Sequence, residues 1–228
     1  MTAGPRLRKR GASGADVRAA VLVLHGGQEN STAPSSPWHP AYIRMVPFAW
    51  DLARVPGVAV WQLCNRYRGW NAPDLDPVAD ARWALDQLRA AYPDVPVALV
   101  GHSMGGRVAL RVADDPAVAG VCALAPWTPE GEPVEQLANR TVLIAHGDRD
   151  RMTDPALSFT YAERAKAVTV TVARFDVRGD AHAMLLRYRE WTRLVRRFTL
   201  GVLGLAEIDR DIAEALAKPA PAGLRVPV

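Results

Sequence analysis

Ser103 lies where a run of apolar residues gives way to a glycine-rich turn, in the segment VALVGHSMGGRVAL of residues 97–110. Residues 97–100 are typical of a strand buried on both faces, and residues 107–113 are typical of a helix. The flanking glycines give the turn the pattern Gly-x-Ser-x-Gly, in which a strand passes sharply into a helix and the serine hydroxyl stays exposed. This pattern predicts a nucleophile at Ser103. The alternative is a glycine turn that binds phosphate or is purely structural.

A serine nucleophile needs a base, and the chain has five histidines that could supply it. His182 is the favoured candidate because it lies in RGDAHAMLL, between an expected strand at 168–175 and an expected helix at 183–200. Loops at the carboxyl edge of a parallel sheet are where a base can reach the nucleophile. The alternative is a loop histidine that only faces solvent.

Three aspartates follow the expected strand 141–145 in TVLIAHGDRDRMTDP, and one of them is the candidate for orienting the base. Asp150 is favoured because it stands three residues beyond Gly147, where the turn after the strand has ended. Asp148 would still lie inside that turn and is the alternative. Asp154, which precedes a proline, is predicted to cap the next helix instead.

A second glycine turn, HGG at residues 25–27, follows the expected strand 19–24. Acyl transfer needs N–H donors aimed at the oxygen that becomes negative in the transition state. One backbone N–H near Gly27 or Gln28 is predicted to join that of Met104, the residue after the candidate nucleophile. These two donors would form an oxyanion hole.

Four segments, strand-HGG, GHSMGG, HGDRD and a late GDAH, resemble in their order and spacing the α/β-hydrolase superfamily over about residues 17–200. The resemblance implies an α/β fold with a mostly parallel central sheet flanked by helices. It also implies a catalytic triad and an oxyanion hole formed by the HGG loop and Met104; the triad residues are Ser103, Asp150 and His182. The superfamily includes esterases, thioesterases, lipases, amidases, haloperoxidases and non-enzymatic members, so the resemblance leaves the substrate open.

The rest of the chain alternates expected strands and helices, as a parallel sheet requires. The further expected elements are helices at 42–55, 76–92, 155–167 and 202–217 and strands at 58–63 and 118–124. Residues 1–16, with the basic cluster RLRKR, are expected to form a flexible arm, and residues 17–217 a single domain. Residues 218–228 are expected to form a loose tail. The antiparallel hairpin that often opens this fold is expected to be missing or reduced to residues 5–10.

The composition of the 228-residue chain is that of an ordinary globular protein, with 49% hydrophobic and 23% charged residues. Its net charge of +4, without a basic face interleaved with aromatic residues, argues against nucleic-acid binding. No apolar stretch approaches the roughly 20 residues of a membrane span. We therefore expect a cytoplasmic protein with no nucleic-acid or membrane partner, no cofactor and no metal. Cys64 and Cys122 are expected to be buried free thiols.

The loops expected at the carboxyl edge supply the candidate substrate-binding residues, which are Gln28, Arg66, Arg68 and Trp127. Guanidinium forks clamp carboxylates and phosphates. Alternatively, these arginines pair with Asp74 or Asp76 and only fix the loop. Trp127 would wall an apolar acyl pocket together with Trp38, or both would pack loops against the sheet.

A lid in this fold usually follows the strand after the nucleophile helix, and here residues 125–140 leave room for one short helix, 133–138. The sequence therefore predicts no large cap and a shallow, open pocket bordered by Trp127 and the loop 64–77. The functional hypothesis is a serine hydrolase that cleaves a small or medium carboxylic ester through an acyl-enzyme. The alternatives are a thioesterase with the same triad and a non-catalytic, ligand-binding member of the fold.

Overall fold

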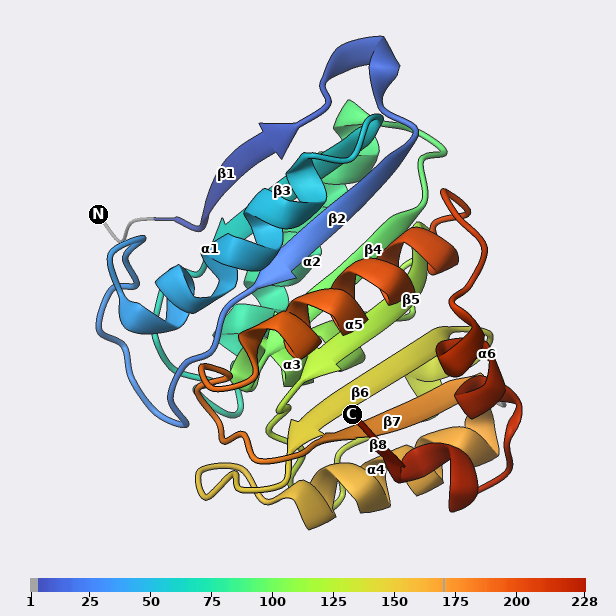
Figure 1. The fold of residues 1–228 in the computed structure, drawn as a ribbon. Coiled ribbons are helices and arrows are strands. Elements are labelled where there is room, and N and C mark those ends of the chain that lie inside the picture. Colours follow the sequence, from blue (N-terminus) through green and yellow to red (C-terminus); the bar gives the residue numbers. More distant parts are fainter. Residues whose placement is uncertain (1–3, 170) are drawn as a thin grey trace.

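The computed structural model describes residues 4–169 and 171–228, and within these ranges eight strands form one sheet (Figure 1). The strands are β1 Arg6–Gly11, β2 Ala19–Leu24, β3 Val58–Cys64, β4 Val97–His102, β5 Val118–Leu124, β6 Thr141–Gly147, β7 Val172–Val177 and β8 Val226–Pro227. They lie in the order β1-β3-β2-β4-β5-β6-β7-β8. β1 pairs antiparallel with β3, and the other neighbouring pairs are parallel.

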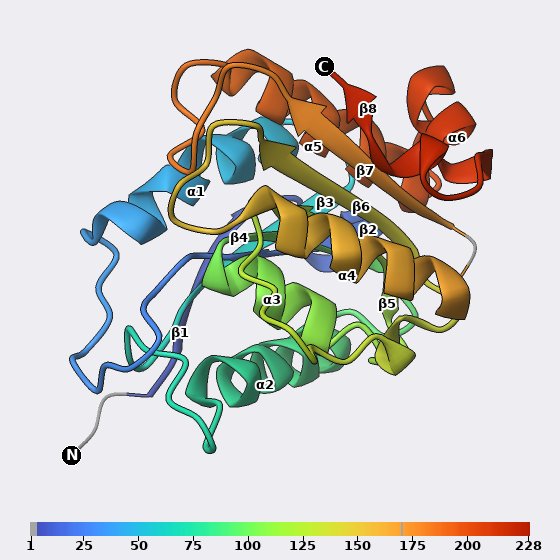
Figure 2. The ribbon, with the colours of Figure 1, turned by 90° about the horizontal axis from the view of Figure 1, so that it is seen from below.

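Helices cover both faces of the sheet and give the molecule three layers (Figure 2). The α-helices are α1 Pro40–Ala53, α2 Asp76–Ala91, α3 Met104–Arg111, α4 Pro155–Val168, α5 Tyr188–Val202 and α6 Arg210–Ala217, and the 3-10 helices are η1 Gly14–Asp16, η2 Glu135–Leu137 and η3 Ala222–Leu224. Residues of α1, α5 and α6 share one hydrophobic core with one face of the sheet. Residues of α2, α3 and α4 share a second core with the other face. The arrangement is the helix-flanked, mostly parallel sheet that the sequence predicts.

The central strands are apolar along their whole length because both of their faces are covered. All six residues of β2 are buried. Leu22 and Leu24 belong to the core beneath α2, α3 and α4, whereas Val21 and Val23 belong to the core beneath α1 and α5. Both cores therefore fix the carboxyl ends of the strands, where the candidate site lies.

The N-terminal residues form an edge strand instead of the flexible arm that we expected for residues 1–16. β1 pairs with β3 from Arg6 opposite Cys64 to Gly11 opposite Ala59. The expectation was wrong because an edge strand can keep charged side chains in solvent while its backbone completes the sheet. This single strand is all that the described residues contain of the opening hairpin, in agreement with the predicted reduction. Residues 1–3 of the expected arm lie outside the described residues.

The C-terminal residues also differ from the loose tail that we expected at 218–228. They form η3 and then β8, in which Val226 lies opposite Phe175 of β7. Beyond β8, the N–H of Arg178 donates to the carbonyl oxygen of Val228 at 3.0 Å. The high proline content suggested a loose segment, but the open edge of β7 supplies backbone partners that ordered residues can use.

Two boundaries around the candidate base lie later in the chain than expected. α5 begins at Tyr188 and not at 183, because the Asp180 carboxylate accepts the N–H of Arg187 at 2.9 Å and holds the preceding residues in a turn. α4 continues to Val168, and β7 begins at Val172, whereas the expected strand began at 168. Val170, within that expected strand, lies outside the described residues. α6 also begins later than the expected start at 202.

Candidate active site

Ser103 occupies the sharp turn between β4 and α3, at the carboxyl edge of the sheet. Its φ of 56° and ψ of −121° are strained for a residue with a Cβ atom, and such strain is common at functional sites. The turn requires glycine on both sides. A Cβ on Gly101 would meet the carbonyl oxygen of Gly105, and a Cβ on Gly105 would meet that of Leu24. The close approach of strand and helix therefore presents the Ser103 hydroxyl at the sheet edge.

Ser103, His182 and Asp150 form a continuous hydrogen-bonded chain, although they come from three separate loops. Ser103 Oγ lies 3.0 Å from His182 Nε2, and His182 Nδ1 lies 2.7 Å from Asp150 Oδ2. The three residues are 8%, 7% and 7% exposed, respectively. Asp148 does not contact the histidine in the described structure; its Oδ1 accepts the N–H of Gly179 at 2.7 Å. The structure thus brings together the three residues that the sequence predicts.

The Asp150 carboxylate is held as an anion by its hydrogen bonds. Met152 N–H and Thr153 N–H donate to Oδ1 at 2.8 Å and 3.1 Å, and the Thr153 hydroxyl donates to Oδ2 at 2.9 Å. Burial disfavours the charge, but hydrogen bonds from His146, His182 and the two N–H groups outweigh burial and keep the pKa of Asp150 well below its usual value. An ionised Asp150 accepts Nδ1–H of His182 and leaves Nε2 as an acceptor.

A second buried histidine, His146, contacts the other side of the Asp150 carboxylate. His146 Nε2 lies 3.2 Å from Asp150 Oδ2, and its Nδ1 lies 2.8 Å from Ser158 Oγ. Arg174 Nε donates to Ser158 Oγ at 3.1 Å. Because an ionised carboxylate only accepts hydrogen bonds, we assign a proton to His146 Nε2. The Ser158 hydroxyl donates to the carbonyl oxygen of Pro155 at 3.0 Å, so a buried network of polar contacts connects Arg174, Ser158, His146 and Asp150.

His102, directly before the serine, supports the base through its backbone. His102 Nε2 lies 2.9 Å from the carbonyl oxygen of His182, and the two rings are 4.7 Å apart between centroids. Burial, aided by the neighbouring His182, lowers the pKa of His102 to about 3. A neutral ring can donate its Nε2–H to that carbonyl oxygen. His102 therefore fixes the position of the His182 backbone and not that of its imidazole nitrogens.

The HGG turn on the opposite side of Ser103 is held by a different histidine. Burial lowers the pKa of His25 to about 4, so this ring is also neutral. His25 Nδ1 donates to the carbonyl oxygen of Gly26 at 2.7 Å, and its Nε2 accepts the N–H of Asn65 at 3.2 Å. Gly26 packs on the serine, because a Cβ built on it would lie 3.2 Å from Ser103 Cβ. These contacts fix the turn that is the candidate oxyanion loop.

The structure distinguishes Gly27 from Gln28, the two residues whose backbone N–H the sequence offered as an oxyanion donor. The N–H of Gln28 donates to the carbonyl oxygen of Arg68 at 2.8 Å, so it is already engaged. Gly27 lies one residue earlier, and a Cβ on it would meet both that same oxygen and the side chain of Met104. Gly27 thus packs directly against the residue that supplies the other candidate donor.

Of the candidate substrate-binding arginines, Arg66 has a structural role in the loop. Its Nε lies 2.6 Å from Asp80 Oδ1, and its Nη2 lies 3.5 Å from Asp76 Oδ1. This is the loop-fixing alternative, with Asp80 as a further partner that we did not predict. Arg68 Nε donates to the carbonyl oxygen of Pro34 at 3.0 Å. Both contacts brace the loop that covers the HGG turn.

Trp127 packs beside the turn that carries Ser103 and not together with Trp38. Its backbone N–H donates to the carbonyl oxygen of Ser103 at 3.2 Å. The Arg107 guanidinium lies 4.4 Å from the Trp127 ring and 3.8 Å from the Trp70 ring, and the two rings meet edge to face. Trp38 is 85% exposed. Between β5 and β6 the described chain forms η2 and no other helix, so no large cap covers the site.

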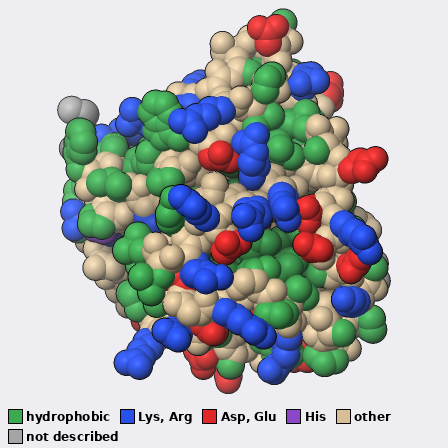
Figure 3. Space-filling view, in the orientation of Figure 1, with side chains coloured by type: hydrophobic (Ala, Val, Ile, Leu, Met, Phe, Trp, Pro, Cys, Tyr) green, Lys and Arg blue, Asp and Glu red, His purple; other side chains and the backbone are tan. Residues whose placement is uncertain are grey.

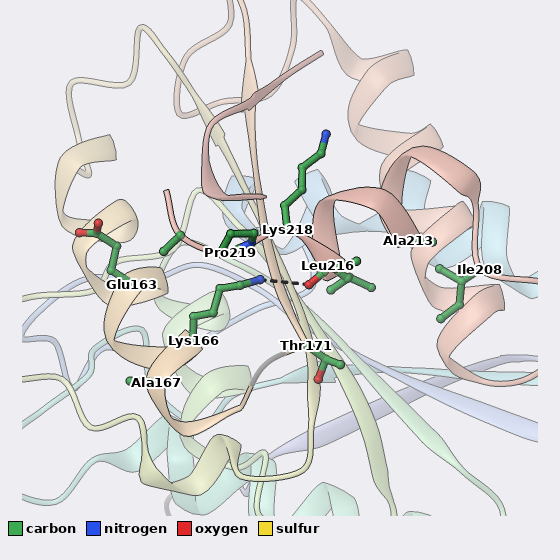
Figure 4. A pocket seen from close by; sticks show the side chains of 11 residues that line it. Glu163, Lys166, Ala167, Thr171, Ile208, Ala213, Leu216, Lys218 and Pro219 are labelled. Atoms are coloured by element: carbon green, nitrogen blue, oxygen red, sulfur yellow. Dashed lines mark hydrogen bonds between the residues drawn. The ribbon is translucent and has the colours of Figure 1, made fainter. Parts of the chain in front are cut away.

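One hollow lies away from Ser103 and His182, between α4 and α6 (Figure 4). Its volume is about 790 Å³. Lys166 in its wall donates to the carbonyl oxygens of Val172 at 2.7 Å and Leu216 at 3.1 Å, so its charge is already bonded. A second hollow of about 500 Å³ lies beside the candidate base, between α1 and the start of α5. The sequence did not predict this second hollow.

Two further findings concern metal sites and membranes. In residues 4–169 and 171–228, no group of three or more His, Cys, Asp or Glu side chains could hold a metal ion. Cys64 and Cys122 are buried free thiols, as expected. No helix in the described part of the chain is long and apolar enough to cross a membrane.

The sequence did not identify His146 and Thr153, which contact Asp150, or Ser158, which contacts His146. His146 lies in the quoted HGDRD segment but was assigned no role, since nothing in its neighbours distinguishes a ligand of Asp150 from a core residue. Thr153 and Ser158 come from the following loop and helix. No sequence signal identifies them, because their contacts depend on how α4 packs against β6 and β7.

The chain is similar in fold to several solved enzymes. Est1E from Butyrivibrio proteoclasticus, with bound ferulic acid, has a TM-score of 0.69 and 15% identity over 88% of this chain and 96% of that chain. The thermophilic esterase Est2 from the Planctomycetes species Thermogutta terrifontis, with bound propionate, has a TM-score of 0.68 and 18% identity over 90% and 92%. A lidless α/β serine hydrolase from Xanthomonas campestris has a TM-score of 0.61 and 20% identity over 90% and 91%.

At these identities the likeness establishes the fold alone. No curated protein matches the chain in sequence. Residues 21–228 match the Alpha/beta hydrolase family, which is most of the chain. The sheet order, the strained serine turn and this match agree, and the chain belongs to the Alpha/beta hydrolase family.

Proposed function

We propose that the protein is a serine hydrolase that cleaves small or medium carboxylic esters through an acyl-enzyme. The observation that carries the proposal is the unbroken chain Ser103–His182–Asp150, with contacts of 3.0 Å and 2.7 Å. Hydrogen-bonded contact between nucleophile and base, with a third group orienting the base, is the geometry that nucleophilic catalysis requires.

In the first half of the reaction, Ser103 Oγ attacks the ester carbonyl carbon while its proton passes to His182 Nε2. Asp150 keeps the other ring proton on Nδ1 and stabilises the imidazolium ion that forms. The tetrahedral intermediate collapses, His182 protonates the departing alcohol, and the acyl group remains on Ser103. In the second half, the oxygen of a water molecule attacks the acyl carbonyl carbon while His182 takes its proton. The second tetrahedral intermediate collapses, His182 returns that proton to Ser103 Oγ, and the carboxylic acid leaves.

The negative oxygen of each tetrahedral intermediate needs two N–H donors. We assign these donors to the backbone of Gly27 and Met104. Gln28 is a weaker choice because its N–H is bonded to Arg68. The N-terminal end of α3 adds the positive end of a helix dipole on the same side as Met104.

Two similar folds support an ester substrate. The Butyrivibrio proteoclasticus structure holds ferulic acid, and the Thermogutta terrifontis esterase holds propionate. Both molecules are carboxylic acids, the product class of ester hydrolysis. The short β5–β6 connection, which holds η2 alone, favours soluble esters over lipid droplets, because no cap is present there to open at an interface.

Covalent labelling tests the proposal directly. A fluorophosphonate probe should label the wild-type protein at Ser103, and Ser103→Ala should abolish labelling while far-UV circular dichroism is unchanged. Wild-type protein should also hydrolyse p-nitrophenyl esters, with a preference for short or medium chains, and Ser103→Ala should lower turnover by roughly 10⁴ to 10⁶. A folded wild-type protein that is neither labelled nor active would show that the site is not a hydrolase. A preference for acyl-CoA substrates would make it a thioesterase.

A further inference from the structure

We infer that the hollow beside His182 is a second part of the substrate site, which binds an apolar acyl chain ending in a carboxylate. The structure assigns recognition of that carboxylate to Arg44 of α1. This inference rests on the proposed ester hydrolysis and names the class of ester, which is a monoester of a dicarboxylic acid.

The hollow is predominantly apolar. Its volume is about 500 Å³, and its lining includes Ile43, Phe48, Met184, Leu185 and Tyr188. Ile43, Leu185 and Tyr188 are 48%, 68% and 55% exposed, so large hydrophobic side chains here remain in contact with solvent. Figure 3 shows hydrophobic side chains gathered on the left of this face, where Figure 1 shows the N-terminal ends of α1 and α5. Such a wall favours an aliphatic or aromatic chain.

The hollow adjoins the loop that carries His182. Ala183 and Met184 in its lining directly follow His182 in the chain. The charge of Arg44 contributes, after burial and the neighbouring His182, to the lowered pKa of His102, whose Nε2 contacts the His182 carbonyl oxygen at 2.9 Å. In the proposed arrangement, the ester carbon lies at Ser103 and the acyl chain passes along the His182 loop into the hollow, toward α1.

Arg44 is the one charged residue that lines this hollow. The other buried or half-buried arginines near the site have partners: Arg66 pairs with Asp80, and Arg107 with Glu132. Arg44 forms no ion pair or side-chain hydrogen bond with residues 4–169 and 171–228. Burial alone lowers its pKa, with no acidic group acting on it.

Arg44 is half-buried, so the apolar wall removes part of the water around its guanidinium and supplies no compensating charge. A carboxylate restores both the charge balance and the hydrogen bonds, since the planar fork of arginine matches the two carboxylate oxygens. An apolar chain with a terminal carboxylate can pack against the apolar wall and pair with Arg44 at the same time. A neutral chain of equal length can pack against the wall but leaves Arg44 without an anion.

Two esters of equal chain length separate these cases. The neutral one is p-nitrophenyl hexanoate, and the charged one is mono-p-nitrophenyl adipate, which ends in a carboxylate. For wild-type protein, Arg44→Met and Arg44→Lys, kcat/KM is measured for both esters at pH 7.5. Arg54→Met is the matched control, because Arg54 is an exposed arginine at the other end of α1.

Arg44→Met should lower kcat/KM for the adipate ester by about tenfold or more, the effect of losing one hydrogen-bonded charge, mainly through KM. The hexanoate value should change less than threefold. Arg44→Lys should retain part of the preference, and Arg54→Met should behave as wild type. Equal effects of Arg44→Met on both esters, or no effect on either, would overturn the inference while leaving ester hydrolysis intact. Absence of wild-type activity and of Ser103 labelling would instead overturn the proposed function.

Discussion

The two sides of Ser103 are built by different means. On the side of β6 and β7, polar side chains hold one another: Asp150 accepts hydrogen bonds from His182, His146 and the Thr153 hydroxyl. On the side of β2 and β3, hydrogen bonds of His25 hold the HGG turn, and close packing limits its oxyanion position, because Gly27 has no room for a methyl group. The Asp150 side thus depends on hydrogen bonds between side chains, whereas the position of the candidate donor at Gly27 depends on the absence of a side chain.

The difference indicates which substitutions each side can tolerate. On the β6–β7 side, an isosteric substitution that alters charge or hydrogen bonding should lower activity and leave the fold unchanged. On the β2–β3 side, the addition of a single carbon at Gly27 should lower activity without any change of charge. Four experiments test this contrast, beginning with the largest expected effect.

Asp150→Asn keeps the shape of the carboxylate but removes its charge, so His182 loses the partner that fixes its tautomer. We expect kcat for ester hydrolysis to fall by about 10⁴ with little change in melting temperature. Asp148→Asn is the matched control, because its contact with the Gly179 N–H can be kept by an amide oxygen. Loss of activity in Asp148→Asn with retention in Asp150→Asn would assign the acid to Asp148.

Gly27→Ala adds one methyl group where the Met104 side chain and the Arg68 carbonyl oxygen already lie. The turn must shift, and a displaced N–H donor should lower kcat by roughly 10² to 10³. Gly4→Ala is a suitable control, since no atom within 4 Å would meet the new Cβ. Fluorescence-monitored melting checks that the protein is folded. Wild-type kcat in a folded Gly27→Ala protein would place the oxyanion donor elsewhere.

His146→Phe removes one donor to the Asp150 carboxylate and keeps a ring in the buried space. We expect kcat to fall roughly tenfold with KM nearly constant, because the backbone donors at Met152 and Thr153 remain. Labelling of Ser103 by the fluorophosphonate should slow by a similar factor. A change in KM alone would argue that His146 only shapes the fold, and the stability of the variant should be measured in parallel.

The smallest effect is on stability in acid. His25 and His102 are both buried near Ser103, and their pKa values fall from 6.5 to about 4 and about 3. The folded protein keeps both rings neutral, whereas the unfolded chain takes up protons as the pH falls below about 6.5. Their contribution to stability is therefore present above that pH and is lost on acidification.

Urea unfolding at pH 7, 6, 5 and 4 measures this loss. Each histidine should contribute up to about 1.4 kcal/mol per pH unit between 6.5 and its folded pKa. Asp150, whose pKa is depressed, adds to the loss at still lower pH. His102→Gln should make the slope shallower by about one proton. Stability that rises on acidification would contradict the burial of neutral rings.

The sequence predicted the fold and the three central residues because each carries a local signal. Buried strands are continuous apolar runs, and the bounds 19–24 and 118–124 agree with β2 and β5. Ser103 is identified by its glycines, and the favoured position of Asp150 follows from the length of the turn before it. The roles of these residues in catalysis stay predictions.

The rest depends on contacts between segments that are distant in sequence. Arg66 was a candidate for substrate binding, but its partner Asp80 lies on the following helix, where no motif identifies it. The basic residues of β1 indicated a flexible arm when considered alone, because their partner strand, β3, lies about 50 residues later in the sequence. The hollow beside the His182 loop forms where α1 and α5 meet, and the hydrophobic pattern of either helix alone does not predict that contact.

The edges of the sheet have a consequence for how the protein behaves in concentrated solution. An open strand edge is a template on which a second chain can add, which leads to aggregation. β1 carries four cationic side chains within residues 6–10, so a second copy approaching that edge meets like charge. The opposite edge offers β8, two residues long and ending in a proline that lacks an N–H. Strand addition is therefore disfavoured at both edges, at β1 most strongly in low salt, where the repulsion between cations is least screened.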